Sequence, residues 1–472
     1  MTQHSQPYSA EVIIIGAGLS GLNAAVQLTD AGVDVLVLEA ADRIGGRVHT
    51  IDLGAGPEEA GGTTYGPTHK RGLALLERFG IETVQFTDDV SYAYSVNGHI
   101  CTAEEWPTSP GNLLVGEERE ILPSRIDNYF MQAFLPFHGL DDWLKPEFAK
   151  YDIPFGDFLR SQGVSDEAQR LVNMCINTDD IETVSALSIF RDAIKWREVG
   201  YDDPKNFNQY GDAQYRPVFA KNGAISLPNA MAAHFERAPQ LGKNVAAVRY
   251  DDSGVTVECL DGTSYRAAQA IISIPVMKLG QIEFDPPLPA PLRRAVQTAK
   301  ASGNTTFYMV AKRHFWEDDG LPMSTWSDTI FERIFVGKLA NGDYRVRAWI
   351  NGDNARRVDK LGDQAGDVLL KTFAKIRPAT EGAIEVVGSY SWGSDPLIGG
   401  EKYVMGPGDV TRFGKVLSEP VGPLFWAGEH HKGRDQGLEA ALQSGERAAA
   451  EVLARRERPT GISQKTNQGI EA

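Results

Sequence analysis

Three glycines near the start of the chain have the spacing of a phosphate-binding turn. Gly16, Gly18 and Gly21 follow the apolar run of residues 11–15 and precede a segment rich in Ala and Leu. In a strand–turn–helix unit, the first glycine permits the tight turn, the second lets a pyrophosphate approach the backbone, and the third allows close helix packing. The free N–H groups of the helix start then face the phosphates. The pattern predicts a dinucleotide site.

An acidic residue at the end of the second apolar run supports this prediction. Glu39 lies 18 residues after Gly21, close to the spacing of a carboxylate that accepts hydrogen bonds from ribose hydroxyls. The runs at 11–15 and 33–39 are largely apolar, so we expect buried parallel strands with helices covering the sheet. Residues 11–39 therefore predict a β-α-β unit of the Rossmann type.

A glycine pair with an arginine follows this unit. The segment from Ala40 to Arg47 reads AADRIGGR, with Arg47 directly after Gly45 and Gly46. A guanidinium is planar and can bind a pyrophosphate through two hydrogen bonds. The segment resembles the flavin-binding extension of the glutathione-reductase-like FAD enzymes, and this resemblance implies FAD as the cofactor.

The rest of the chain mixes strand and helix patterns. Residues 91–220 are rich in aromatic residues and have helical periodicity, which predicts a mainly helical region inserted into the first domain. Alternation and turn residues predict strands at 245–250, 255–259, 270–274, 303–312 and 343–350. Apolar periodicity predicts helices at 364–376 and 437–455.

Composition excludes several classes of protein. The 472 residues include 63 acidic and 47 basic residues, for a formal charge of −16, and no basic cluster that would bind nucleic acid. Cys101, Cys175 and Cys259 lie too far apart for a disulfide framework, which favours a reducing compartment. The start has no signal-peptide pattern, and no apolar run reaches the roughly 18 residues of a membrane helix. We therefore expect a cytoplasmic protein without a membrane segment.

Four further blocks point to one family. They are Glu59–Thr68 with Gly61-Gly62, Phe284–Pro289 followed by His314-Phe315-Trp316, Ser391–Pro396 with Trp392 ahead of Pro407-Gly408, and Ala427-Gly428-Glu429 ahead of residues 437–445. Together they resemble the flavin-containing amine oxidases, the superfamily of monoamine and polyamine oxidases. The resemblance spans residues 11–455 in the same order.

This resemblance implies an α/β (α+β) fold in which a Rossmann-like FAD-binding domain carries an inserted mixed substrate domain with a sheet and a mainly helical region. We assign residues 1–90, 221–290 and 385–460 to the FAD-binding domain, 91–220 and 291–384 to the substrate domain, and 461–472 to a polar tail. The implied FAD contacts are Gly16, Gly18, Ser20, Gly21, Glu39, Ala40, Arg47, Gly61, Gly62, Thr63, Val245, Trp392, Gly428, Glu429, Gly437 and Leu438.

Several of these contacts have particular roles by resemblance. Val245 would hold the adenine through its backbone, while Gly428 and Glu429 would lie by the ribityl chain. The N–H groups of Gly437 and Leu438, at the start of the last helix, would stabilise negative charge at the N1/O2 edge of the flavin. The adjacent His430 and His431 lack a third ligand at helical spacing, so we expect no metal site.

One position departs from the family pattern beneath the flavin. Most members place a lysine between the Pro-Pro-Leu-Pro and Phe-Trp motifs, where its ammonium holds a water below flavin N5. The same count reaches Thr306 in this chain. Its hydroxyl can hold a water but brings no cation, which disfavours fast reaction of reduced flavin with oxygen. The alternative is that Thr306 is only a strand residue.

The aromatic cage of the monoamine oxidases is also altered. Its first position falls on Glu401 or Lys402, with Tyr403 as the nearest aromatic residue, and its second falls on Gly437. A missing wall favours a bulky, cyclic or aromatic amine, although residues 399–402 could equally form a simple turn. The cysteine that tethers flavin in the mitochondrial enzymes corresponds to about Glu401, so we expect FAD to be bound non-covalently.

The resemblance implies FAD-dependent oxidation of an amine C–N bond by hydride transfer to flavin N5. The imine product is then hydrolysed, and O2, giving H2O2, or another redox partner reoxidises the flavin. The candidate catalytic residues are Thr306, Trp392, which would pack near the flavin, Lys402 and Tyr403. Besides the small-molecule amine and the acceptor, we expect neither nucleic acid nor a membrane as a partner, with a homodimer left open.

Three alternatives remain on the same fold. An L-amino-acid oxidase would need an arginine to bind the substrate carboxylate, for which Arg191, Arg197 and Arg216 are candidates. A flavin-dependent C–C desaturase or isomerase would fit the altered cage and the absent lysine. An FAD-binding scaffold without turnover is the third.

Overall fold

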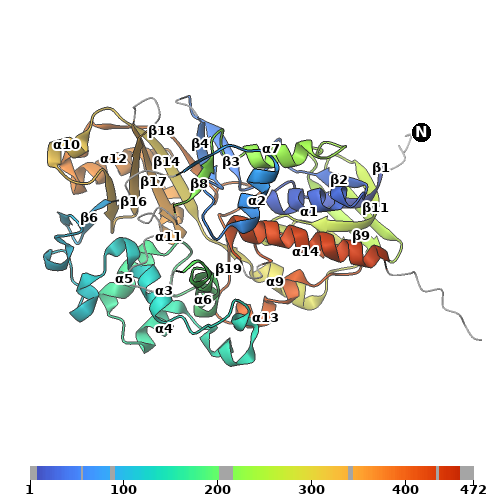
Figure 1. Cartoon of the computed structure of the whole chain (residues 1–472), viewed down its shortest axis with the longest axis horizontal. Coiled ribbons are helices and arrows are strands. Elements are labelled where there is room, and N and C mark those ends of the chain that lie inside the picture. Colours follow the sequence, from blue (N-terminus) through green and yellow to red (C-terminus); the bar gives the residue numbers. More distant parts are fainter. Residues whose placement is uncertain are drawn as a thin grey trace, which may run out of the picture.

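A computed structural model of the chain describes residues 8–54, 57–85, 91–200, 216–338, 344–431 and 435–457. The predicted polar tail at 461–472 lies outside these residues. Figure 1 shows two strand-rich lobes, one on the right and one on the left, with a group of helices below the left-hand lobe.

The first sheet includes the parallel strands at the start of the chain. Seven of the described strands make up this sheet, in the order β12 (Glu283–Asp285), β9 (Val245–Asp251), β10 (Gly254–Cys259), β11 (Ser264–Ile272), β1 (Tyr8–Ile15) and β2 (Val35–Leu38), with β20 (Leu424–Trp426) paired to β11. β1 runs parallel to both β2 and β11, and Ile13 and Ile14 within it are fully buried. The predicted β-α-β unit is therefore confirmed.

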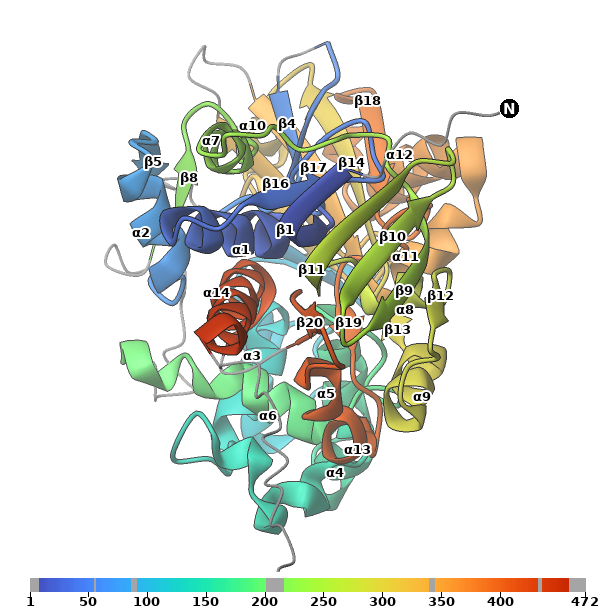
Figure 2. The ribbon, with the colours of Figure 1, turned by 90° about the vertical axis from the view of Figure 1, so that its right-hand side faces the viewer.

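Two long helices cover this sheet near the glycine-rich turn. α1 (Leu19–Asp30) follows Gly18 directly, and α14 (Gly437–Glu457) packs along it. The pair lies side by side in both ribbon views (Figures 1 and 2). Their approach is close, since a Cβ atom on Gly445 would lie 2.4 Å from the carbonyl oxygen of Ser20. The first helix of the chain and the long helix α14 thus pack closely near the start of α1. The neighbouring helices are α2 (Lys70–Arg78) and α7 (Ser226–Ala233).

The second sheet is built mainly from the later half of the chain. Its strands are, in order, β18 (Ile384–Ser391), β14 (Asn304–Ala311), β17 (Tyr344–Asn351), β16 (Arg333–Lys338), β15 (Ser324–Ser327), β6 (Tyr92–Val96) and β7 (His99–Cys101). β14 confirms the strand predicted at 303–312. β18 pairs with β14, so residues 384–391 belong to the second sheet, whereas the predicted domain boundary falls at 385. The helices that follow these strands are α10 (Phe315–Asp319), α11 (Gly352–Asp359) and α12 (Ala365–Ile376).

The aromatic-rich stretch is mainly helical, as predicted, although it begins with β6 and β7 and ends with the strand Val218–Ala220. Its α-helices are α3 (Ile126–Ala133), α4 (Phe155–Ser161), α5 (Asp166–Cys175) and α6 (Ala186–Ile194). Its rings pack on one another, as shown by Phe190, whose ring centroid lies 5.0 Å from that of Phe158 and 5.9 Å from that of Tyr151. These aromatic side chains therefore build a core within the helical layer.

Short elements connect the two lobes. They are the pairs β3 (His49–Asp52) with β4 (Pro57–Gly61), β5 (Thr83–Gln85) with β8 (Val218–Ala220), and β13 (Lys300–Ala301) with β19 (Tyr403–Val404), and the helices α8 (Val276–Leu279), α9 (Ala290–Thr298) and α13 (Asp409–Phe413).

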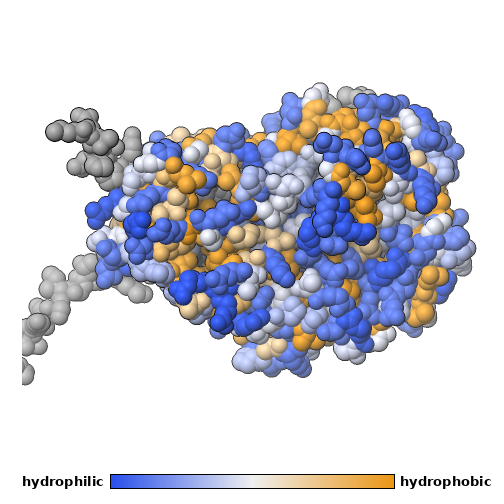
Figure 3. Space-filling view, turned by 180° about the vertical axis from the view of Figure 1, so that it is seen from behind, coloured by the Kyte–Doolittle hydropathy of each residue, from blue (hydrophilic) through white to orange (hydrophobic). Residues whose placement is uncertain are grey.

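The face opposite to Figure 1 is predominantly hydrophilic, with hydrophobic residues in separate groups (Figure 3). Within the described ranges, no helix combines the length and the apolar character that crossing a bilayer requires.

Candidate functional site

The glycine-rich turn between β1 and α1 has the geometry that its sequence predicts. Gly16 has a φ of +104°, a conformation that favours glycine. A Cβ atom on Gly21 would lie only 2.1 Å from the carbonyl oxygen of Gly16, so a side chain at this position would force α1 away from the turn. The first turn of α1 therefore stays close to the strand end, with its N–H groups at the cavity described below.

Glu39 is fixed at the edge of this turn. Its Oε2 atom accepts a hydrogen bond from the Ala17 N–H at 2.7 Å, and its Oε1 atom accepts one from the Ala41 N–H at 2.9 Å. These two backbone donors hold the carboxylate at the end of β2, where it also lines the cavity. The ribose contact of this carboxylate stays a prediction.

One cavity of about 610 Å³ joins the turn to the second sheet. Among the predicted cofactor residues, those that line it are Gly16, Gly18, Ser20, Glu39, Ala40, Arg47, Gly61, Gly62, Thr63, Val245, Trp392, Glu429, Gly437 and Leu438. Gly21 lies behind the wall, in its predicted packing role. Gly428 is also outside the lining, and its Cβ would lie 2.3 Å from the ring of His430. The cavity thus brings together segments from both ends of the chain.

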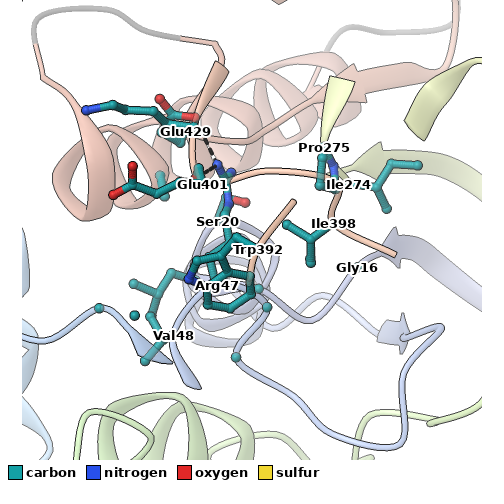
Figure 4. Close-up of a pocket in the computed structure, with 18 of the residues that line it drawn as sticks. Gly16, Ser20, Arg47, Val48, Ile274, Pro275, Trp392, Ile398, Glu401 and Glu429 are labelled. Carbon is teal, nitrogen blue, oxygen red and sulfur yellow. Dashed lines mark hydrogen bonds and ion pairs between the residues drawn. The ribbon is translucent and has the colours of Figure 1, made fainter. Parts of the chain in front are cut away.

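Arg47 joins these segments. Its Nη1 atom donates to the carbonyl oxygen of Glu401 at 2.7 Å and to Oε2 of Glu429 at 3.2 Å (Figure 4). The side chain of Arg47 keeps a quarter of its surface accessible, while that of Glu429 is only 4% exposed. Burial raises the pKa of the Glu401 carboxyl, which lines the same wall.

The wall between the two sheets is formed by close backbone packing. Trp392 is buried and donates from Nε1 to the carbonyl oxygen of Ala60 at 2.8 Å. A Cβ atom on Gly61 would lie 2.4 Å from the carbonyl oxygen of Arg47 and 3.0 Å from Cζ2 of Trp392. A Cβ atom on Gly62 would lie 2.7 Å from a methyl group of Val48. Side chains at these glycines would obstruct the cavity wall.

The far end of the cavity lies against the second sheet. Thr306 of β14 is directly opposite Trp349 of β17, and both line the cavity together with Lys402. Three of the four predicted catalytic residues, Thr306, Trp392 and Lys402, therefore line the cavity. The fourth, Tyr403, is 3% exposed, packs with its ring 6.4 Å from that of His430, and is not among the described lining residues. Its strand pairing with β13 turns it into the core.

Sequence reasoning missed several lining residues. Trp349, His69, Lys195 and Trp196 all contribute to the wall. Trp349 alternates with buried residues along a predicted strand, so its face could have been inferred from periodicity. His69 accepts a hydrogen bond from the Gly66 N–H at 2.8 Å, and burial, aided by the charge of Lys195, lowers its pKa to about 3. No pattern in the sequence marks Lys195 and Trp196 as lining residues.

The three arginines named as candidate carboxylate ligands for an L-amino-acid oxidase are not among the described residues that line the cavity. Arg191 is 2% exposed, donates to Ser188 Oγ at 3.2 Å and lies over the ring of Trp143. Arg197 donates to the carbonyl oxygen of Phe137 at 3.0 Å. Neither these two nor Arg216 is among the described lining residues, in which the arginines are Arg47 and Arg347.

The parallel unit of β1 and β2, the glycine-rich turn, the fixed Glu39 carboxylate and the cavity that they share are typical of a dinucleotide-binding enzyme. Comparisons with known proteins specify this class further. The family model described as flavin-containing amine oxidoreductase matches residues 19–453. The chain belongs to this family.

Relatives match over nearly the whole length. A putative flavin-containing monoamine oxidase, AofH, of Mycobacterium tuberculosis is 28% identical over 465 residues, covering 95% of this chain and 97% of that protein. An L-amino acid dehydrogenase of Synechocystis is also 28% identical, covering 94% and 95%. The solved structure of a cyclohexylamine oxidase from Brevibacterium oxydans superposes with a TM-score of 0.78 at 26% identity, covering 95% of this chain and all of that one.

The chain is therefore an FAD-dependent amine oxidoreductase, and the residues present fit this cofactor. The glycines leave room along the wall, and Arg47 and Glu39 supply the polar groups. No cysteine occurs among the described residues that line the cavity, and non-covalent binding of FAD stays a prediction.

Proposed function

We propose that the chain oxidises the C–N bond of a bulky, cyclic or aromatic amine at the end of the cavity lined by Trp392, Thr306 and Trp349. The observation that carries this proposal is the continuity of the cavity. The same wall that includes Gly16 and Arg47 extends to Trp349 of the second sheet and to Trp392, which follows β18. An amine bound there would lie in the same cavity as FAD held by the glycine-rich turn.

Bound FAD supplies the acceptor for the hydride that leaves the α carbon of the amine. The chain's own residues bind and orient the substrate and limit the access of water. Trp349 and Trp392 offer flat apolar walls, and Trp392 is fixed by its bond to Ala60. The amine loses one hydride from carbon and one proton from nitrogen, which gives a C=N bond, and water then hydrolyses the imine.

Thr306 has a positioning role in this proposal. Its side chain is 6% exposed on the cavity wall, where the hydroxyl can hold one water molecule. A threonine supplies no positive charge, and a cation would favour negative charge that develops when oxygen is reduced. We therefore infer that oxygen or another redox partner reoxidises the enzyme. A redox partner other than oxygen is favoured, because Thr306 brings no positive charge.

Anaerobic spectroscopy tests this function. Purified holoenzyme is mixed without oxygen with benzylamine, cyclohexylamine and a cyclic secondary amine, and the oxidised flavin band is followed. Loss of the band with any of them is the expected result, and recovery on admitting air measures the use of oxygen. A band that none of these amines changes would contradict the proposal and favour C–C desaturation.

The dehydrogenase relative from Synechocystis supports L-amino acids as a second candidate substrate class. The ion pair of Arg347 disfavours this substrate class. Arg347, which lines the cavity, directs both Nε and Nη2 to Oε2 of Glu58. A carboxylate next to the reacting carbon would have to displace that ion pair.

A further inference from the structure

The carboxyl group of Glu401 differs from the other carboxyl groups of the cavity wall. The described lining residues that carry a carboxyl group are Glu39, Glu59, Glu401 and Glu429. Both oxygens of Glu39 accept backbone N–H groups, and both oxygens of Glu59 accept hydrogen bonds at 2.9 Å. Glu429 accepts through Oε2 from Arg47 and from the backbone N–H of Tyr403. No described residue donates a hydrogen bond to the carboxyl of Glu401.

One oxygen of the Glu401 carboxyl can be reached from the cavity. Oε2 is buried, whereas Oε1 is not fully buried and also has no donor among the described residues. The residue as a whole is only partly buried, and it lines the cavity. An accessible carboxyl oxygen without a donor can accept a hydrogen bond or a proton from a molecule bound in the cavity.

The backbone places Glu401 at the substrate end of the cavity. Its N–H donates to the carbonyl oxygen of Ser302 at 2.9 Å, and the Ser302 N–H donates to the carbonyl oxygen of Lys402 at 2.9 Å. Two residues further on, Asn304 begins β14, lines the cavity and accepts the N–H of Trp392 at 3.0 Å. Glu401 and Trp392 are thus attached to the same short segment at the start of β14.

His69, the one histidine among the described lining residues, is not available as a base. Its Nδ1 atom accepts the Gly66 N–H at 2.8 Å, so the proton of the neutral ring is on Nε2. Burial lowers its pKa to about 3, so the ring stays neutral. Neither ring nitrogen then has a free lone pair. Among the described lining residues, the remaining candidate for taking up a proton at this end is Glu401.

The charges around Glu401 keep it at the seam between the two sheets. Burial raises its pKa, and the charge of Glu429 acts in the same direction. Lys402, Arg47 and Arg333 lower its pKa. Arg47 belongs to the cofactor side and Arg333 to β16 of the second sheet, and the three labelled groups Arg47, Glu401 and Glu429 lie next to one another in Figure 4. A carboxyl whose pKa is raised is a stronger proton acceptor.

We propose that Glu401 accepts the proton that the substrate ammonium group loses before the α carbon releases its hydride. This inference rests on the proposed function and adds a catalytic residue to it. An alkylammonium group has a pKa of about 10, so the substrate arrives charged at neutral pH. One N–H bond breaks, its electron pair stays on nitrogen, and the proton forms an O–H bond with the Glu401 carboxylate. The lone pair on nitrogen can then form the C=N bond.

Proton counting on the holoenzyme tests this step without turnover. The probe is 2-phenylpropan-2-amine, which has the ring and amino group of benzylamine but no hydrogen on its α carbon. Calorimetry at pH 8 in two buffers of different ionisation enthalpy measures the protons that binding releases. The wild type should release almost none, because the proton stays within the pair of amine and Glu401. Glu401→Gln should bind the neutral amine and release about one proton more.

The pH dependence of anaerobic flavin reduction by benzylamine tests the catalytic role. In the wild type the rate should rise with pH as Glu401 loses its proton. Glu401→Gln should slow the reaction about 10²–10⁴-fold at pH 7.5 and recover towards pH 10, where the solution supplies neutral amine. Added formate should restore part of the rate in Glu401→Ala. A merely structural role would lower the rate equally at both pH values and would not respond to formate.

Two further variants serve as controls. Glu401→Asp keeps the carboxyl group and should retain part of the rate at pH 7.5. Glu385→Gln, exposed on β18 and paired with Lys312, should behave as the wild type in both measurements. Flavin absorbance identifies a variant that has lost FAD. In that case the proton count of the wild type decides alone, since release of about one proton on binding would mean that no group in the cavity takes it up.

The outcomes are distinct for the two proposals. The same proton count in the wild type and in Glu401→Gln, or an unchanged rate of flavin reduction at pH 7.5, would overturn the role of Glu401 and leave amine oxidation intact. A difference in proton count without flavin reduction by any amine would support the proton site and contradict the proposed function.

Discussion

At the scale of the residue, Arg47 is the contact that joins the first and last parts of the chain across the cofactor cavity. Arg47→Ala removes its bonds to the Glu401 carbonyl and to the buried Glu429 carboxylate. Hydrogen bonds to charged groups contribute about 1.5–3 kcal/mol, so FAD affinity should fall about tenfold to a hundredfold. Titration of apoenzyme with FAD measures this. Arg249→Ala, which removes an exposed ion pair with Glu258, should retain FAD normally; equal retention by both variants would contradict the role of Arg47.

Gly61 provides a test of the cavity wall. In Gly61→Ala, the new methyl group would lie 2.4 Å from the Arg47 carbonyl and 3.0 Å from the Trp392 ring. We expect a loss of about 1–3 kcal/mol in the free energy of unfolding, and weaker FAD retention. Gly280→Ala is the control, because its nearest neighbour would be Val296 at 3.6 Å, an ordinary contact. Thermal unfolding of the two holoenzymes makes the comparison. A Tm of Gly61→Ala equal to that of the wild type would show that the cavity wall can accommodate the methyl group.

Glu332 should make stability depend on pH. Burial raises its pKa from 4.5 to about 7, although Arg333, Asn354 and Asn351 act in the opposite direction. The folded chain then holds a proton between about pH 4.5 and 7 that the unfolded chain releases, so the free energy of unfolding falls as pH rises through this window. Glu332→Gln should flatten that decline. Tm measured at pH 5.5 and 7.5 checks it; parallel declines in wild type and variant would refute the assignment to Glu332.

At the scale of the element, the packing of α14 on α1 positions the start of both helices at the cavity. Gly445→Ala would place a methyl group 2.4 Å from the Ser20 carbonyl and 3.1 Å from the Ala24 nitrogen. Alanine is favoured over glycine in a helix by about 1 kcal/mol, but the clash should outweigh this gain and lower both Tm and FAD content. Ala450→Gly is the control. Residue 450 is exposed on the same helix, so this substitution should cost only the difference in helix propensity between alanine and glycine. A stabilised Gly445→Ala would contradict the close crossing.

Elements with strong local patterns could be predicted from the sequence. The apolar runs around Gly16 and Glu39 became β1 and β2, and the predicted helix at 437–455 became α14. Pairing between distant strands could not, because register depends on contacts that no local pattern records. β18 pairs with β14, and this pairing places residues 384–391 in the second sheet. The same limit hid the alignment of Thr306, Trp349 and Arg333 across three neighbouring strands of the second sheet.

At the scale of the whole molecule, the site is the seam between two sheets. Motifs near the cofactor could be predicted because glycine spacing and a terminal carboxylate follow from the chemistry of phosphates and ribose. The substrate end could not, since it is assembled from strands and helices far apart in the chain. Tyr403 shows this: its place next to Lys402 suggested the cage, but its side chain packs in the core.

The central claim is that an amine at this seam loses hydrogen from its α carbon to the bound flavin. The most direct measurement compares the anaerobic rate of flavin reduction by benzylamine with that by benzylamine deuterated at the α carbon. The account predicts that both reduce the flavin and that deuterium slows the reaction severalfold. Flavin that stays oxidised with benzylamine and with every other amine tried would contradict it.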